Sequence, residues 1–95
     1  MKRSVRVSPA AREDLTRLAA FVRDRAPDKS GEVRHRLHAA LAGLSEFPER
    51  GPVVDQAAGI RELRVRLGRY GYVIQYRVDE DAVFVAHLYH AREQR

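Results

Sequence analysis

Apolar residues in the first third of the chain recur at helical spacing. They are Ala11, Leu15, Leu18 and Val22. Steps of four, three and four place them on one stripe of an amphipathic helix. Ser8 can cap the free N–H groups at its start, and Pro9 fits the first helical position. Glu13 and Asp14 are interpreted as acidic residues that suit the helix dipole. We predict a helix that begins at Pro9 and ends before Pro27.

A second helix is predicted after a short connection. Ser30 can cap it. Its apolar stripe consists of Val33, Leu37, Ala40, Leu41, Leu44 and Phe47. Pro48 closes the pattern, and residues 48–52 are rich in turn formers. Residues 9–47 are therefore expected to form an antiparallel helical hairpin.

The apolar period changes from helical to two in the second half of the chain. Residues 60–67 and 70–78 alternate between apolar and polar positions, and residues 82–90 are apolar on both faces. Gly68-Arg69 and residues 79–81 suit hairpin turns between these segments. Residues 4–7, with two valines, fit a first strand. The predicted order is β-α-α-β-β-β.

These elements predict one two-layer α+β domain that spans residues 1–95. The helical hairpin would pack on one face of a small antiparallel sheet. The other face would then display Arg64, Arg66, Gln75 and Arg77.

Composition excludes several classes of protein. Cysteine is absent, which excludes a disulfide framework and thiolate chemistry. No apolar run is long enough to span a membrane, so we expect a soluble cytoplasmic protein. With 44% hydrophobic and 33% charged residues, the chain can fold into a packed domain with a solvated surface.

The charge of the chain is uneven. The formal net charge is +5, and Lys2 and Lys29 are the only lysines, so arginine dominates. Residues 61–77 hold five arginines, namely Arg61, Arg64, Arg66, Arg69 and Arg77. A single acid, Glu62, opposes them. A basic surface of this kind attracts nucleic acid or an acidic protein.

Several motifs, in this order, resemble a known family. Ser8-Pro9-Ala10-Ala11 with Asp14-Leu15 is similar to its first helix opening, and residues 44–51 (LSEFPERG) to its second helix exit. Residues 60–63 (IREL), 71–78 (GYVIQYRV) and 88–92 (LYHAR) resemble its last three strands. Together they resemble the RelE/ParE superfamily of bacterial type II toxins, over nearly the whole chain.

The resemblance implies a toxin that a cognate antitoxin, ParD-like or RelB-like, holds inactive. ParE-like members inhibit DNA gyrase, whereas RelE-like members cut messenger RNA on the ribosome. The Phe-Pro-x-x-Gly exit and the Tyr-Arg-Val and His-x-Arg endings are closer to the ParE-like side. A gyrase inhibitor linked to plasmid stabilisation is therefore the first expectation, and a ribosome-dependent, metal-independent endoribonuclease is the alternative.

The expected site residues depend on whether the protein is a gyrase inhibitor or an endoribonuclease. Arg64 and Arg66 share one face of a strand and can clamp phosphates, or can simply be solvated and paired with Glu62. If the protein is a nuclease, the catalytic residues are expected to be Arg64, Arg66, His90 and Arg92. The residues expected to contact the target or the antitoxin are Arg61, Arg64, Arg66, Arg69, Arg77, Tyr89, His90 and Arg92.

The remaining candidates have plain structural readings. His90 can transfer a proton from a ribose 2′-OH, or can cap the end of a strand. His87 is assigned no catalytic role. His35 and His38 lie three apart on the second helix without further ligands, so no metal and no cofactor are expected. Tyr72 and Tyr76 fall in the apolar stripe and are expected in the core.

An apolar groove for the antitoxin is expected between the hairpin and the sheet edge. We also expect exposed hydrophobic surface on the isolated chain, and an antitoxin segment that is acidic or amphipathic.

Overall fold

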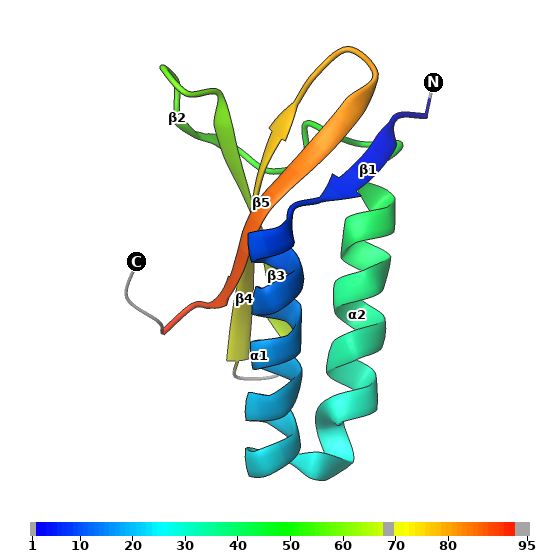
Figure 1. Ribbon diagram of the computed structural model, residues 1–95, viewed down its shortest axis with the longest axis vertical. Helices are drawn as coiled ribbons and strands as arrows, with labels where there is room; N and C mark the ends of the chain where they lie inside the picture. The colour runs from blue at the N-terminus through cyan, green and yellow to red at the C-terminus, as the bar shows by residue number, and fades with distance from the viewer. Residues whose placement is uncertain (1, 68–69, 93–95) are drawn as a thin grey trace.

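The computed structural model describes residues 2–67 and 70–92. The elements are β1 (Ser4–Val7), α1 (Pro9–Arg25), a 3₁₀ turn η1 (Pro27–Lys29), α2 (Ser30–Gly43), β2 (Val53–Asp55), β3 (Ile60–Leu67), β4 (Tyr70–Val78) and β5 (Ala82–His90). The two helices run side by side as a hairpin (Figure 1). The predicted helices and the four predicted strands are confirmed, and β2 is an addition to them.

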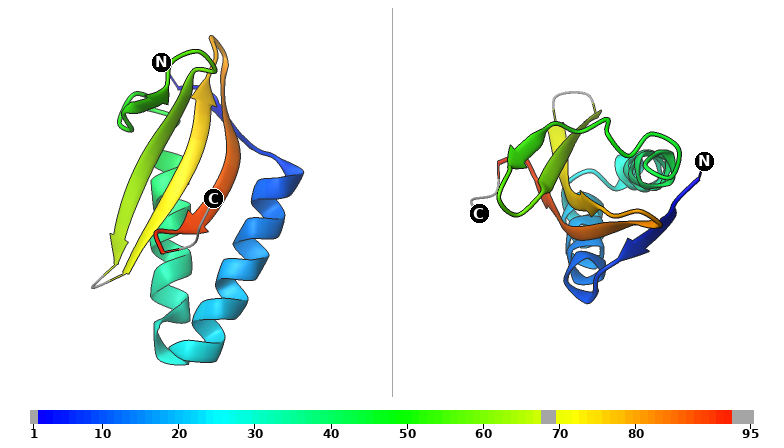
Figure 2. Two further views of the ribbon diagram at one scale, coloured as in Figure 1. Left: turned by 90° about the vertical axis from the view of Figure 1, so that its left-hand side faces the viewer. Right: turned by 90° about the horizontal axis from the view of Figure 1, so that it is seen from above.

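The five strands form one sheet in the order β1-β5-β4-β3-β2. Both helices cover one face of this sheet, so the predicted two-layer α+β architecture is confirmed (Figure 2). The sheet is mixed rather than wholly antiparallel, because β1 pairs in parallel with β5. A parallel pair needs a long crossover, and here the helices and the other strands supply it.

The helices and the sheet enclose one hydrophobic core. The buried helical side chains are Ala11, Leu18, Val22, Val33, Leu37 and Leu41. Facing them from the sheet are Leu63, Val65, Leu67, Tyr72, Ile74, Tyr76, Val83, Val85 and Leu88. Tyr72 and Tyr76 therefore lie in the core as predicted. At the start of α1, the Ser8 hydroxyl accepts a hydrogen bond of 3.0 Å from the Ala11 N–H, which confirms the predicted cap.

The end of α2 differs from the sequence prediction. The helix ends at Gly43, and the N–H groups of Leu44, Ser45 and Glu46 each bond three residues back. This tighter winding turns Phe47 out of the predicted stripe, and it is 61% exposed. At the other end of α2, Ser30 does not cap the helix, because its hydroxyl donates to the Pro27 carbonyl.

Tyr76 fixes the connection from α2 to β3. Its buried hydroxyl donates to the Pro48 carbonyl at 2.8 Å and accepts from the Gly51 N–H at 2.9 Å. A Cβ at Gly51 would lie 2.7 Å from the Glu62 carbonyl oxygen, so only glycine fits there. The Arg61 guanidinium donates to the Gly51 carbonyl at 2.7 Å. The turn-rich break thus follows a path set by three contacts with the sheet.

Within the described ranges, no helix is long and apolar enough to cross a membrane.

Candidate functional site

The sheet face turned away from the helices gathers most of the predicted site residues. We call it the outer face and define it by Arg6, Glu62, Arg64, Arg66, Val73, Gln75, Arg77, Phe84 and Tyr89. Strand alternation creates it: in β3, Leu63, Val65 and Leu67 are buried whereas Arg64 and Arg66 are exposed. The sequence prediction that arginines occupy the face opposite the helices is therefore confirmed for Arg64, Arg66 and Arg77.

Glu62 is held at the centre of the outer face. Its Oε2 accepts a hydrogen bond of 2.8 Å from Gln75 Nε2 and one of 3.1 Å from the Tyr89 hydroxyl. Across the described residues, no salt bridge joins Glu62 to Arg64 or Arg66. The carboxylate thus orients Tyr89 across the strands rather than pairing with either arginine.

Val73 lies between Arg64 and Tyr89 in the strand register. It is only 1% exposed although it is on the outer face. Side chains on both sides therefore already cover the middle of this face.

A hollow of about 290 Å³ opens at one end of the outer face. Its lining residues are Arg6, Val7, Ser8, Ile60, Arg77, Phe84, Val85 and Ala86. The Arg77 guanidinium carbon lies 5.5 Å from the centre of the Phe84 ring. The hollow is therefore an apolar depression with two cationic side chains beside it.

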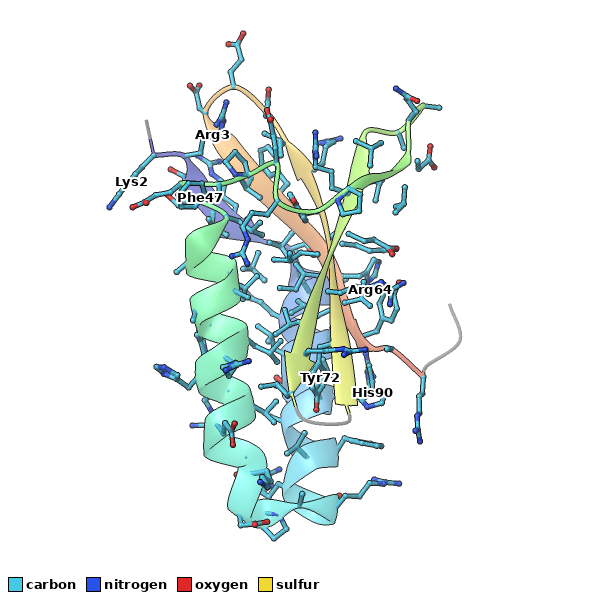
Figure 3. All side chains as sticks on the ribbon, turned by 180° about the vertical axis from the view of Figure 1, so that it is seen from behind. Lys2, Arg3, Phe47, Arg64, Tyr72 and His90 are labelled. Atoms are coloured by element: carbon cyan, nitrogen blue, oxygen red, sulfur yellow. The ribbon has the colours of Figure 1, made fainter. Side chains whose placement is uncertain are left out.

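His90 lies on the opposite side of the sheet from these arginines. It pairs in register with Tyr72, is 6% exposed, and packs edge-on against the Tyr72 ring at 5.3 Å (Figure 3). The Phe21 ring lies 5.8 Å away, and the Arg92 N–H donates to His90 Nδ1. The structure therefore does not bring His90 together with Arg64 and Arg66.

Arg61, Arg69 and Arg92 also belong to the predicted contact set. Arg61 points to the α2–β3 connection, where it bonds the Gly51 carbonyl, so its role here is structural. Arg92 is exposed beyond the end of β5. Arg69 lies outside the described residues.

Asp14 is a buried polar residue that sequence reasoning misinterpreted. It lies beyond the first turn of α1, is 8% exposed, and its Oδ2 accepts the Leu88 N–H at 3.0 Å. His87 Nδ1 lies 3.1 Å from the same oxygen, and Arg17 donates to Oδ1 at 3.1 Å. The signal was available, because Asp14 stands within the apolar stripe between Ala11 and Leu18.

Helix α1 thereby completes the edge of β5. The partner strand β1 reaches only to Val85. Beyond it, the Ser8 hydroxyl donates to the Ala86 carbonyl, Asp14 accepts from Leu88, and Arg17 donates to the Leu88 carbonyl at 3.3 Å. His87 is thus an edge residue whose side chain is paired with Asp14 of α1.

No group of three or more His, Asp or Glu side chains in the described ranges is placed to hold a metal ion. His35 and His38 are both exposed on α2.

Comparison with known proteins agrees with the fold. A model of the ParE toxin of the type II toxin–antitoxin system parDE matches residues 5–95. The chain belongs to this family. The predicted membership in the RelE/ParE superfamily is confirmed, and the protein is a type II toxin.

The family model is named for ParE, whereas two similar curated toxins are named RelE. Toxin RelE3 of Caulobacter vibrioides is 37% identical over 93 residues, covering 98% of this chain and 99% of the relative. Toxin RelE1 of the same organism is 36% identical over 92 residues, covering 97% of each.

Solved structures confirm the fold. The chromosomal ParDE system of P. aeruginosa matches with a TM-score of 0.74 at 14% identity, covering 94% of this chain and 96% of that one. The toxin–antitoxin complex RelBE2 of Mycobacterium tuberculosis matches with a TM-score of 0.60 at 26% identity, covering 95% and 99%. Similarity therefore fixes the superfamily and leaves the target to be argued from the site.

Proposed function

We propose that this toxin inhibits DNA gyrase by binding it, and that a cognate antitoxin neutralises the toxin in the bacterial cytoplasm. The observation that carries the proposal is the position of His90, because its distance from the arginines favours a toxin that binds its target over one that cleaves RNA. A general acid or base has to lie within hydrogen-bond reach of the proton that it transfers. His90 is buried against Tyr72 and Phe21, on the side of the sheet away from Arg64 and Arg66.

The outer face is suited to binding. It presents four described arginines, while the Glu62 carboxylate accepts hydrogen bonds from Gln75 and Tyr89. Guanidinium groups recognise carboxylates and phosphates in a bidentate manner, and both groups are plentiful on a topoisomerase bound to DNA.

A partner surface for the antitoxin is also supported. The matched ParDE system and the RelBE2 complex both pair a toxin with an antitoxin. In this chain Phe47, Val53 and Val54 are exposed at 61%, 44% and 52%. Exposed apolar side chains together with a net charge of +5 favour an antitoxin segment that alternates apolar and acidic residues.

A supercoiling assay with purified gyrase tests the target. We expect the chain to block supercoiling, and the Arg64→Glu/Arg66→Glu variant to need at least about tenfold more protein, because two cationic contacts are reversed. Arg12→Glu/Arg34→Glu, on exposed helix positions, is the matched control and should inhibit normally. Normal supercoiling in the presence of a chain that stops cell growth would contradict the proposal.

A RelE-like endoribonuclease is the second candidate, and one contact favours it. The Tyr89–Glu62 hydrogen bond places a hydroxyl and a carboxylate on the same face as Arg64. In that reading Glu62, rather than His90, would accept the 2′-OH proton. Messages cut within minutes of induction, and intact messages with Glu62→Gln, would favour this function over gyrase inhibition.

A further inference from the structure

The hollow at the end of the outer face spans four strands of the sheet. In the register, Arg6 of β1 pairs with Phe84 of β5, which pairs with Arg77 of β4, which pairs with Ile60 of β3. The two arginines therefore stand on either side of Phe84. Neighbouring strands are about 4.8 Å apart, so their backbones are separated by roughly 10 Å.

Neither arginine of the hollow is used to hold the fold together. In the ranges 2–67 and 70–92, no salt bridge and no side-chain hydrogen bond involves Arg6 or Arg77. The contact of Arg77 is with the Phe84 ring, at 5.5 Å from its centre. An aromatic ring beside two exposed guanidinium groups is the combination that binds stacked bases and their phosphates.

The size and the lining of the hollow select the ligand. About 290 Å³ is just below the usual range of small-molecule pockets, so at most one flat ring with its attached groups is the expected occupant. Phe84 and Ile60 supply apolar surface for the ring, and Arg6 and Arg77 supply charge on both sides. A base between two phosphates meets all these conditions at once, whereas an acidic peptide side chain leaves the aromatic surface unused.

The hollow also lies in line with the other cations. From Arg77, the outer face continues over Gln75 and Tyr89 to Arg64 and Arg66. Tyr89 is held in place by Glu62, so a second ring lies along this path.

We propose that the hollow binds one nucleotide of a single nucleic-acid strand, with the base on Phe84 and the flanking phosphates on Arg6 and Arg77. The strand continues over Tyr89 to Arg64 and Arg66. This inference rests on the proposed function, in which the strand belongs to the DNA that gyrase holds.

Binding of fluorescent twelve-nucleotide strands to the full chain, followed by anisotropy over a range of salt concentrations, tests the subsite. Log affinity falls as log salt concentration rises, and each lost phosphate contact makes this slope shallower by about 0.7 for a single strand. Arg6→Ala/Arg77→Ala loses two such contacts, so its slope should be shallower than the native slope by about 1.4. Phe84→Leu should weaken binding about tenfold with an unchanged slope, because it removes stacking and no charge.

Arg12→Ala/Arg34→Ala, which removes the same charge from the helices, is the control and should keep the native slope. An Arg6→Ala/Arg77→Ala slope equal to that of the control would overturn the subsite. A labelled oligoglutamate is the competing probe. If it binds more tightly than the nucleic-acid strands and Arg6→Ala/Arg77→Ala abolishes that binding, the hollow is an acidic-peptide site and the subsite is overturned.

DNA and RNA strands of one sequence separate the two sources of the ligand. A preference for DNA fits the gyrase proposal, and a preference for RNA keeps the subsite but assigns it to message. Gyrase is absent from this measurement, so a negative result removes the subsite and leaves the supercoiling test to decide the proposed function.

Discussion

Asp14 shows how much one side chain contributes to this fold. Its carboxylate is buried, and it joins α1 to β5 through the Leu88 N–H and His87. Burial of a carboxylate is costly unless its hydrogen bonds are made, and here both of its oxygens have partners. The residue thus stabilises the joint between the layers and has no need of a role in target binding.

Replacement of Asp14 by alanine should lower the free energy of unfolding by about 3 kcal/mol, because the Leu88 N–H loses its acceptor within the protein. Urea denaturation followed by circular dichroism measures this change. Asp24→Ala, at an exposed position of the same helix, should change stability by less than about 0.5 kcal/mol. Equal stabilities of the two variants would show that the carboxylate does not brace the layers.

The connection between α2 and β3 is an element with a defined path despite its lack of regular structure. The Tyr76 hydroxyl bonds both Pro48 and Gly51, and Arg61 bonds Gly51 from the next strand. The Phe-Pro-x-x-Gly pattern divides accordingly: the Gly51 backbone serves the fold, whereas the side chain of Phe47 faces solvent.

A pair of glycine substitutions separates the effect of a close backbone contact at Gly51 from the effect of helix propensity at Gly31. Gly51→Ala should destabilise the protein by about 2 kcal/mol or more, since the new methyl would meet the Glu62 carbonyl at 2.7 Å. Gly31→Ala in α2 meets nothing within 4 Å and should stabilise by up to about 1 kcal/mol. Urea midpoints of the two variants measure the difference, and a shift of the same sign in both would refute this account.

At the scale of the whole molecule, three large exposed apolar side chains lie outside the hydrophobic core. Phe47, Val53 and Val54 all belong to the segment between α2 and β3, and they contribute little to the buried core. Exposed apolar side chains lower solubility, and they fit the proposal that the chain functions with a bound antitoxin.

Phe47→Asp should make the isolated chain more soluble and weaken binding of its antitoxin at least about tenfold, because an apolar contact becomes a charge facing an acidic segment. Unfolding free energy should stay within about 0.5 kcal/mol of the native value, as the side chain is 61% exposed. Titration calorimetry with the antitoxin measures the affinity. His38→Asp, an exposed change on α2, is the control, and an equal loss in both would point to charge alone.

Periodicity was sufficient to predict the helices, the strands and the arginine face, because each depends on local alternation. The pairing of strands that are far apart in the sequence could not be predicted from periodicity. The parallel register that sets Arg6 beside Phe84 joins residues far apart in the chain, and no local pattern encodes that pairing. His90 was placed correctly at the end of the last strand, but its side of the sheet was not predicted. A bulge between Gln75 and Tyr76 shifts the pairing of β5, so counting along the sequence does not give that side.

The hydrogen bonds that α1 makes with β5 have a consequence for assembly. Sheet edges with open backbone groups invite strands from other chains, and side chains or helices that cover them prevent such pairing. The stretch of β5 beyond the end of β1 has its backbone groups hydrogen-bonded by the side chains of Ser8, Asp14 and Arg17. Among the described strands, the edges left for an incoming strand are therefore β1 on one side and β2 and β3 on the other. This arrangement limits both edge-to-edge aggregation and the positions at which a partner strand can extend the sheet.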